Sequence, residues 1–342
     1  MKKVITMLLM AVAMNAFADE WYDESTGFTW YYTISGDAAT LTGCSPKEGM
    51  LPPLPSVLGG KTVTIINDNA FNGCSGFTGS LTIPKSVTTI GSSAFYNCSG
   101  FSGSLIIPNS VVTIGDRAFH SCKGFSGSLT IPDSVMTIGS AAFGVCSGFT
   151  GSLTISASVT KIRNHTFTGC SGFTGCLIIP NSVTIIEEYA FYGCSGFSGL
   201  LTIPDGVTTI GARAFYECSG FTGSLTIPDS VISIGTYAFR SCGFSGLLTI
   251  GEGVEKIDSS AFYCCYGLVD VMFCGAPMEG WNQCLFYAKT PPSFFEKYAT
   301  EWKMVFDFKN LRELMREGVP VAKVISAKMR ATITADIRSL NF

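Results

Sequence analysis

The sequence predicts a mainly β solenoid, and two regularly spaced columns of residues support that prediction. A Phe recurs every 24 residues, with a final step of 23, and a Cys follows three residues after each one. The two columns are Phe71, Phe95, Phe119, Phe143, Phe167, Phe191, Phe215, Phe239 and Phe262, and Cys74, Cys98, Cys122, Cys146, Cys170, Cys194, Cys218, Cys242 and Cys265. A period between about 20 and 30 residues indicates stacked units that are each too small to bury an apolar face alone. The composition agrees, since 46% hydrophobic residues and 38 Gly are typical of many buried short strands and tight turns.

The N-terminus has the three regions of a secretory signal peptide. Lys2 and Lys3 precede an apolar core from Val4 to Ala13, and a small-residue pattern ends at Ala18. We interpret residues 1–18 as a signal peptide cleaved after Ala18. The alternative is an uncleaved anchor, but this apolar core is shorter than the roughly 20 residues that span a bilayer. We therefore expect a secreted or cell-surface protein with no transmembrane segment in the mature chain.

Residues 19–61 are expected to form an N-terminal cap. The β-prone stretches Phe28–Ile34 and Ala38–Leu41 are joined by Ser-Gly-Asp, which predicts a β-hairpin. Such a unit is needed because an open solenoid end exposes strand edges and core residues to water.

One repeat predicts a coil with several short sides. In the copy that begins at Leu201, Leu201–Ile203 alternates inward and outward like a short strand, and Val207–Ile210 makes a second extended side. Ala214–Cys218 fits a tight helical or irregular turn. Gly211 and Gly220 are expected to turn the chain.

The repeat resembles the BspA-type leucine-rich repeat of bacterial surface proteins. The pattern I-P-x-x-V-x-x-I-G-x-x-A-F-x-x-C stands, for example, at Ile131-Pro132, Val135, Ile138-Gly139, Ala142-Phe143 and Cys146. The resemblance covers residues 62–274 and implies an array of about nine leucine-rich repeat units of 23 to 24 residues. It also implies a surface protein that mediates protein–protein interaction or adhesion to host matrix, host cells or other bacteria.

The periodicity stops before residues 275–342, which we expect to form a small α+β C-terminal cap or tail. Phe294–Trp302 and Asn310–Glu317 have helical patterns, whereas Ile325–Ile337 alternates like a strand. The residues give no function for this segment.

The cysteine column predicts packing and not cross-linking. Side chains in one column of a solenoid point the same way, so we expect nine reduced and buried thiols. The five cysteines outside the column are the candidates for one or two disulfides, and they are Cys44, Cys176, Cys264, Cys274 and Cys284.

No pattern of catalytic, metal-binding or cofactor-binding residues stands out. The cysteines outside the column form no C-x-x-C pair typical of zinc sites, and the two histidines occupy different places in their repeats. We therefore expect no enzyme activity, no metal and no cofactor. Residues 19–274 contain 10 Lys and Arg against 18 Asp and Glu, and this acidic balance argues against nucleic acid as a partner.

Binding is expected instead on columns of the solenoid surface. The residue after the core Phe is Tyr or Arg at many repeats, and these types are enriched at binding hot spots. The candidate binding residues are Tyr96, His120, Tyr192, Tyr216, Arg240 and Tyr263. The alternative is that they only cover the turn. A second exposed row is expected from the middle of the Leu-x-Ile strand, at Thr82, Ile106, Thr130, Thr154, Ile178, Thr202, Thr226 and Thr249.

The partner predicted from these columns is another protein or a cell-surface macromolecule. Two other function classes stay open at this point. The Tyr column is also compatible with a carbohydrate-binding surface, and an enzyme hidden in the tail is the third interpretation. The tail contains no His and only scattered carboxylates.

Overall fold

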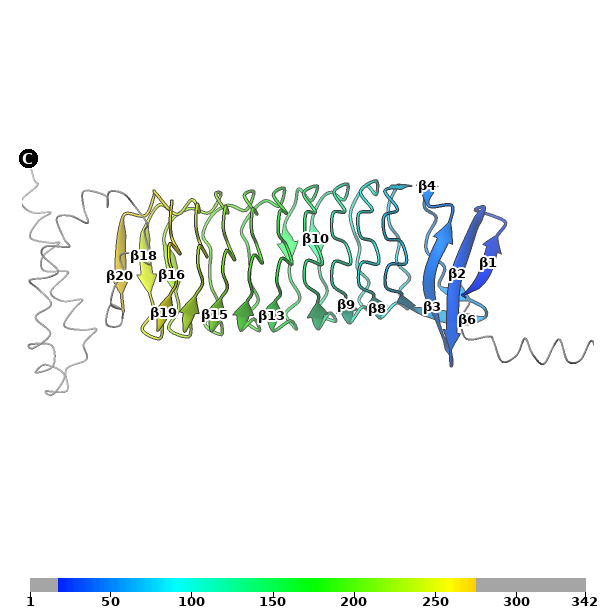
Figure 1. Ribbon diagram of the computed structural model, residues 1–342, viewed down its shortest axis with the longest axis horizontal. Coiled ribbons are helices and arrows are strands. Elements are labelled where there is room, and N and C mark those ends of the chain that lie inside the picture. The colour runs from blue at the N-terminus through cyan, green and yellow to red at the C-terminus, as the bar shows by residue number, and fades with distance from the viewer. Residues whose placement is uncertain (1–17, 275–342) are drawn as a thin grey trace, which may run out of the picture.

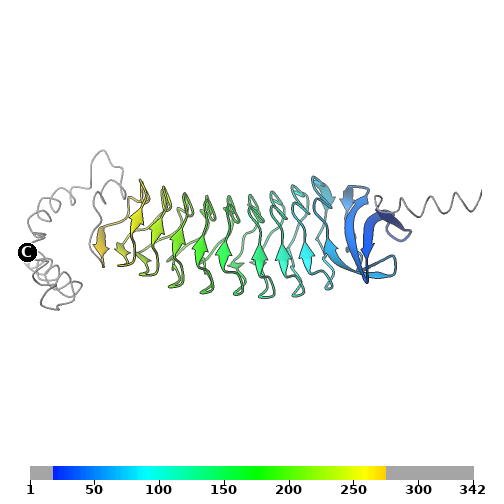
Figure 2. The same ribbon diagram turned by 60° about the horizontal axis from the view of Figure 1, so that its bottom comes forward.

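The computed structural model describes residues 18–274 and shows an elongated solenoid with a sheet at its N-terminal end (Figure 1). Successive coils are stacked side by side along the long axis, and the same arrangement is visible after rotation (Figure 2). All twenty elements of this part of the chain are β-strands, and it contains no helix. The predicted mainly β solenoid is confirmed. The expected C-terminal cap lies outside the described residues.

The N-terminal cap is the predicted hairpin extended by further strands. β1 (Asp19–Asp23), β2 (Phe28–Ser35) and β3 (Ala38–Ser45) form an antiparallel meander. β6 (Lys61–Ile66) then pairs parallel with β3, and β5 (Val57–Leu58) pairs antiparallel with β6. The cap therefore converts an antiparallel sheet into the parallel ladder of the repeats.

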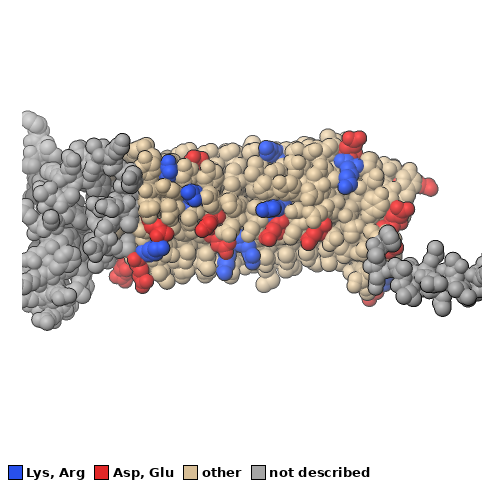
Figure 3. Space-filling view, in the orientation of Figure 1, with Lys and Arg blue, Asp and Glu red and all other residues tan. Residues whose placement is uncertain are grey.

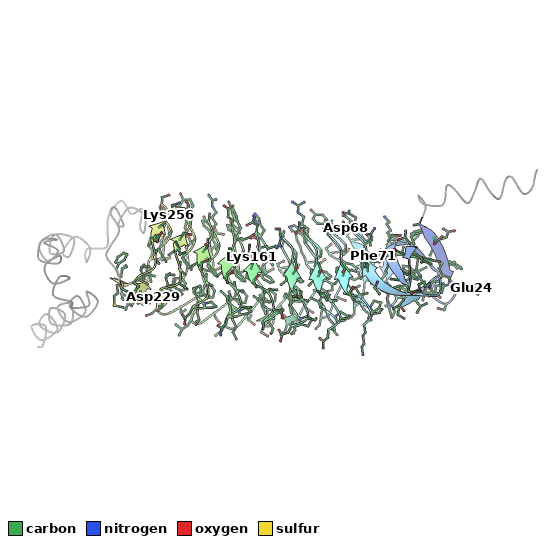
Figure 4. The ribbon with its side chains drawn as sticks, turned by 90° about the horizontal axis from the view of Figure 1, so that it is seen from below. Glu24, Asp68, Phe71, Lys161, Asp229 and Lys256 are labelled. Carbon is green, nitrogen blue, oxygen red and sulfur yellow. The ribbon has the colours of Figure 1, made fainter. Side chains whose placement is uncertain are left out.

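The first side of the coil is a parallel ladder that continues from the cap. Residues one full repeat apart are paired, as Thr113 is with Thr89. The strands that follow β6 are β8 (Thr89–Ile90), β9 (Thr113–Ile114) and β11 (Thr137–Ile138), and the second sheet of this side consists of β13 (Lys161–Ile162), β14 (Ile185–Ile186), β15 (Thr209–Ile210), β17 (Ser233–Ile234) and β19 (Lys256–Ile257). Lys161 and Lys256 begin the two outer strands of that second sheet (Figure 4).

The second side carries the Leu-x-Ile segments, and its ladder is discontinuous. One sheet of this side pairs β10 (Leu129–Thr130) with β12 (Leu153–Thr154), and another consists of β16 (Leu225–Ile227), β18 (Leu247–Ile250) and β20 (Asp270–Phe273). A separate pair, β4 (Glu48–Met50) with β7 (Gly76–Thr78), lies nearer the cap and contains the Gly-Phe segment of its repeat. In the copy at Leu201, Leu201 and Ile203 are buried and Thr202 is exposed, as predicted, although these residues belong to no strand.

The third side is a series of turns around the core Phe. In the repeat of Phe215, Arg213 and Glu217 have φ of 54° and 61°. Because residues with positive φ are interspersed with ordinary ones here, every second N–H points at the next coil. Phe215 N donates to Ala238 O at 2.7 Å and Glu217 N to Arg240 O at 2.9 Å. The turn predicted over Ala214–Cys218 is thus irregular and not helical. In the repeat of Phe215 and its neighbours, this turn leaves two residues partly exposed. One stands two places before the Phe, and the other directly follows it.

The core is dominated by two parallel stacks of Phe rings. The first stack is the predicted Phe column, with centroids 5.0 to 5.8 Å apart. The second stack is the Phe of the Gly-Phe pairs, namely Phe77, Phe101, Phe125, Phe149, Phe173, Phe197, Phe221 and Phe244. Every ring in both stacks is at most 1% exposed. Burying a Phe contributes about 1.5–3 kcal/mol, so these columns supply much of the drive for stacking.

The cysteine column is buried and reduced, as predicted. Eight of its thiols donate a hydrogen bond of 2.9 to 3.1 Å to the carbonyl of the core Phe on the preceding coil, as Cys170 does to Phe143 O. Burial raises the pKa of the Cys122 and Cys170 thiols to about 12. The column therefore links coils by hydrogen bonds as well as by packing.

The two glycine columns correct one sequence prediction. Gly211 and Gly220 do not have positive φ, so turning the chain is not what requires glycine there. A Cβ on Gly211 would lie 2.6 Å from the main chain of Glu187 and Glu188, and one on Gly220 would overlap the Phe197 carbonyl oxygen. Glycine is needed because the preceding coil approaches too closely for a side chain.

Candidate functional site

The predicted binding column falls into two separate groups in space. Its members follow the core Phe and are partly exposed on one side of the solenoid. Tyr96 and His120 form a stacked pair near the cap, with centroids 5.2 Å apart. Gly144 and Thr168 then interrupt the column. The second group lies toward the other end.

In that second group the rings stack along the solenoid. Tyr192 and Tyr216 have centroids 5.1 Å apart and planes 16° apart. The guanidinium of Arg240 continues the stack, 5.2 Å from the centroid of Tyr216 on one side and 4.8 Å from that of Tyr263 on the other. The structure therefore brings together four of the six predicted residues.

A neighbouring column, which lies outside the six predicted binding residues, completes this group. It consists of the residues two places before each core Phe, all of which have positive φ in the repeats concerned. Arg213 lies between Tyr189 and Tyr237, with its guanidinium carbon 5.3 Å from each ring centroid, and its Nη1 donates to the Tyr189 hydroxyl at 2.6 Å. A search for Tyr and Arg at this second place of the 24-residue period would have identified the column.

Tyr237 connects the two columns. Its ring centroid lies 4.9 Å from the Arg240 guanidinium carbon as well as 5.3 Å from that of Arg213. We call the combined set the tyrosine–arginine surface, and it consists of Tyr189, Tyr192, Arg213, Tyr216, Tyr237, Arg240 and Tyr263. Each of these seven side chains is partly exposed. Two cations are thus held within a tyrosine framework over four consecutive coils.

The charge of this surface is not neutralised within the described chain. The ion pairs of residues 18–274 are Lys61–Asp37 and Lys256–Asp258, and neither involves Arg213 or Arg240. The Nε of Arg240 is buried and has no hydrogen-bond partner in that part of the chain. Burial and then the Glu217 carboxylate raise the pKa of Tyr192, so an acidic group also acts on this surface.

The two histidines are placed by ring stacking and do not form a joint site. Besides its contact with Tyr96, His120 has its Nδ1 2.9 Å from the Ser121 hydroxyl. His165 stacks on Tyr189 at 4.5 Å. Burial lowers the pKa of both imidazoles. Each imidazole therefore contributes a flat ring to a stack of aromatic rings, one with Tyr96 and the other with Tyr189.

The second predicted row is also exposed but chemically plain. Ile106 and Ile178 are 71% and 72% exposed, and the Thr members are exposed except for Thr249, which is partly buried. The two isoleucines are three coils apart, so they do not form a continuous apolar patch. On the face shown in Figure 3, acidic and basic side chains are scattered over a mostly uncharged surface.

Four of the five cysteines outside the column, the candidates for disulfides, lie in the described residues. Cys44, Cys176, Cys264 and Cys274 are free thiols, with Cys44 buried and Cys176 exposed, while Cys284 lies outside the described residues. Burial raises the pKa of Cys44 to about 12.

Neither a metal-ligand cluster nor a membrane-spanning helix occurs between residues 18 and 274. In this range no three His, Cys, Asp or Glu side chains converge as metal ligands would. It also has no helix with the length and apolar character needed to cross a membrane.

Comparison with known proteins gives the family of the repeats. Six copies of a family model described as the BspA type leucine rich repeat region match residues 53–174, 102–194 and 175–290. No curated protein shows significant similarity to this chain.

Several solved structures are similar to this chain. A leucine-rich repeat protein from Bacteroides ovatus ATCC 8483 is 22% identical, with 76% of each chain covered and a TM-score of 0.48. A leucine rich cell surface protein from Faecalibacterium prausnitzii A2-165 is 22% identical over 80% of this chain and 99% of its own, with a TM-score of 0.43. The T. pallidum leucine rich repeat protein is 23% identical over 70% and 88%, with a TM-score of 0.40. The family model matches well over half of the residues of the present chain, which therefore belongs to the BspA-type leucine-rich repeat family.

Proposed function

We propose that this protein is secreted or surface-exposed and binds another protein through the tyrosine–arginine surface. The observation that carries the proposal is the concentration of five Tyr and two Arg side chains on one side of four adjacent coils. Tyr and Arg are the residues most often found at binding hot spots, because they combine a large contact area with directional polar groups. Membership in a family that generally consists of surface proteins supports the same proposal.

The ring geometry favours a protein partner over a sugar held by ring stacking. The faces of Tyr216 are occupied by Tyr192 on one side and Arg240 on the other. Tyr237 likewise contacts both guanidinium groups, at 5.3 and 4.9 Å from its ring centroid. A partner therefore meets ring edges, hydroxyls and guanidinium N–H groups, which suit the polar and apolar mixture of a protein surface.

Placement outside the cell rests on the leader sequence. Residues 1–18 have the charged, apolar and small-residue regions of a signal peptide. Adhesion to host matrix, host cells or other bacteria is the specific role that we propose for the exported chain.

The decisive experiment replaces Tyr192 and Tyr216 together with Ala in the mature chain, residues 19–342. We expect binding to immobilised matrix proteins or to whole cells to fall at least tenfold, which corresponds to about 1.4 kcal/mol for two hot-spot residues. The measurement is a binding curve by biolayer interferometry or flow cytometry.

The matched control replaces Tyr96 with Ala, because this ring occupies the same column outside the tyrosine–arginine surface. It should bind like the wild type. Equal binding by Y192A/Y216A and wild type, with an unchanged melting temperature, would refute the assignment of this surface.

A further inference from the structure

We propose that the tyrosine–arginine surface recognises a short acidic segment of its protein partner, with Arg213 and Arg240 each taking one carboxylate. This inference rests on the proposed function and specifies the partner's chemistry. It begins from the unusual placement of two like charges within one group of rings.

The two guanidinium groups share a contact with one tyrosine ring, and their contacts leave hydrogen-bonding capacity unused. Both lie near the ring of Tyr237, at 5.3 and 4.9 Å from its centroid. A guanidinium offers five N–H donors. Arg213 uses one of them for the Tyr189 hydroxyl, and the Arg240 Nε has no hydrogen-bond partner within residues 18–274.

An anionic ligand would remove two unfavourable features at once. It would balance the positive charge of two guanidinium groups that no ion pair of residues 18–274 neutralises, and it would supply acceptors for their outer N–H groups, since the Arg240 Nε itself is buried. Carboxylates match the planar guanidinium fork and bind it with two parallel hydrogen bonds. Tyrosine rings on both sides fix each guanidinium in place, so little side-chain freedom is lost on binding.

The distribution of charge around this surface selects a short acidic segment over a long polyanion. Glu187 and Glu188 lie on the coil of Tyr189, Glu217 follows Tyr216, and Asp258, which pairs with Lys256, lies on the coil of Tyr263. These carboxylates therefore lie on the coils adjoining those of the two arginines, or on the coil of Arg213 itself. A polyanion such as a sulfated glycan would extend over them and be repelled, whereas two acidic side chains flanked by neutral residues would not.

The test uses the Nε–Hε signals of the arginines in a nitrogen-15-labelled mature chain. R213Q and R240Q assign the two signals by their loss. Titration with a tetraglutamate peptide should shift both signals and leave that of Arg117 unchanged, and added salt should reverse the shifts. Arg117 is the matched control because it occupies the same column as Arg213, with φ of 54°, but belongs to a part of the described solenoid outside the tyrosine–arginine surface.

Two variants connect this site with partner binding. R213Q/R240Q should weaken binding to the cells or matrix proteins recognised by the wild type at least tenfold, while R117Q should not. R213K/R240K retains the charge but lacks the planar fork, so it should bind between the two. Melting temperatures establish that each variant is folded.

Each of the other outcomes overturns the inference. It fails if tetraglutamate shifts neither arginine, if it shifts Arg117 equally, or if a heparin disaccharide binds at the same arginines more tightly. It also fails if R213Q/R240Q binds cells normally. In that last case the loss of binding in Y192A/Y216A would still support the proposed function, so the two proposals are tested separately.

Discussion

Replacing Gly196 with Ala tests the structural reason for the glycine columns. Gly196 belongs to the same column as Gly220 and does not have positive φ, so Ala is permitted by the local backbone. The added Cβ would meet the carbonyl oxygens of Phe173 and Ser171 on the preceding coil, well inside the 3.0 Å that Cβ atoms essentially never cross. Both obstructing atoms belong to the main chain. Relief requires moving one coil away from the other.

The expected cost follows from that displacement. Overpacking that side chains can absorb costs about 1–3 kcal/mol. Here the neighbouring atoms are main-chain atoms, and separating the coils weakens the stacks in which Phe173 and Phe197 lie 5.6 Å apart. We therefore expect G196A to lower the free energy of unfolding by at least about 3 kcal/mol, near the upper end of single substitutions.

Gly175→Ala is the matched control. Gly175 has φ of +77° and nothing within 4 Å of an added Cβ, so the cost there is only the left-handed conformation, about 1–2 kcal/mol. Urea unfolding followed by circular dichroism measures both values. If G196A were no more destabilising than G175A, close approach of the coils would be the wrong explanation for this column.

Three other predictions follow from the core, the cysteine column and the leader. Phe191→Ala should destabilise the protein by about 3–5 kcal/mol in urea unfolding, because it empties a fully buried position in a continuous ring stack; a cost below about 1 kcal/mol would show that the stack contributes little. Burial raises the pKa of Cys170 from its ordinary value of 9.0 to about 12. The contribution of this thiol to the free energy of unfolding is therefore present below pH 9 and is lost as the pH rises toward 12, because the unfolded chain releases the thiol proton first. The stability of C170A should therefore fall less steeply than that of the wild type over this range, and equal slopes would count against it. Mass spectrometry of the exported protein should find Asp19 at the N-terminus, and a retained leader would show that cleavage after Ala18 is wrong.

The fold was largely predictable because repetition makes each column visible many times. The Phe and Cys columns specified the buried side of each coil, and the Phe28–Leu41 hairpin was recognisable from β-prone stretches around a turn. The reason for the glycines was not predictable in this way. Gly211 and Gly220 look like turn residues in a linear sequence, and only the distance between coils shows that they allow close approach.

The candidate site was predictable in part. The sequence identified Tyr192, Tyr216, Arg240 and Tyr263 because they share one place in the repeat. It did not identify the role of Tyr189 and Tyr237, since they stand in another place and become neighbours only after the turn brings the two columns together. Likewise, Tyr96 and His120 met the same sequence criterion, but their distance from the other four follows from the interruption at Gly144 and Thr168.

Each arginine of this surface lies between tyrosines of the preceding and the following coil. The order of these repeats is therefore constrained. A whole repeat inserted within the stack of Phe rings near the cap would preserve every local contact of the core. The same insertion between the coils of Phe215 and Phe239 would separate Arg213 from Tyr237 and Tyr216 from Arg240. The number of repeats near the cap can therefore change without altering the tyrosine–arginine surface. The coils from Tyr189 to Tyr263 must instead stay together and in their present order.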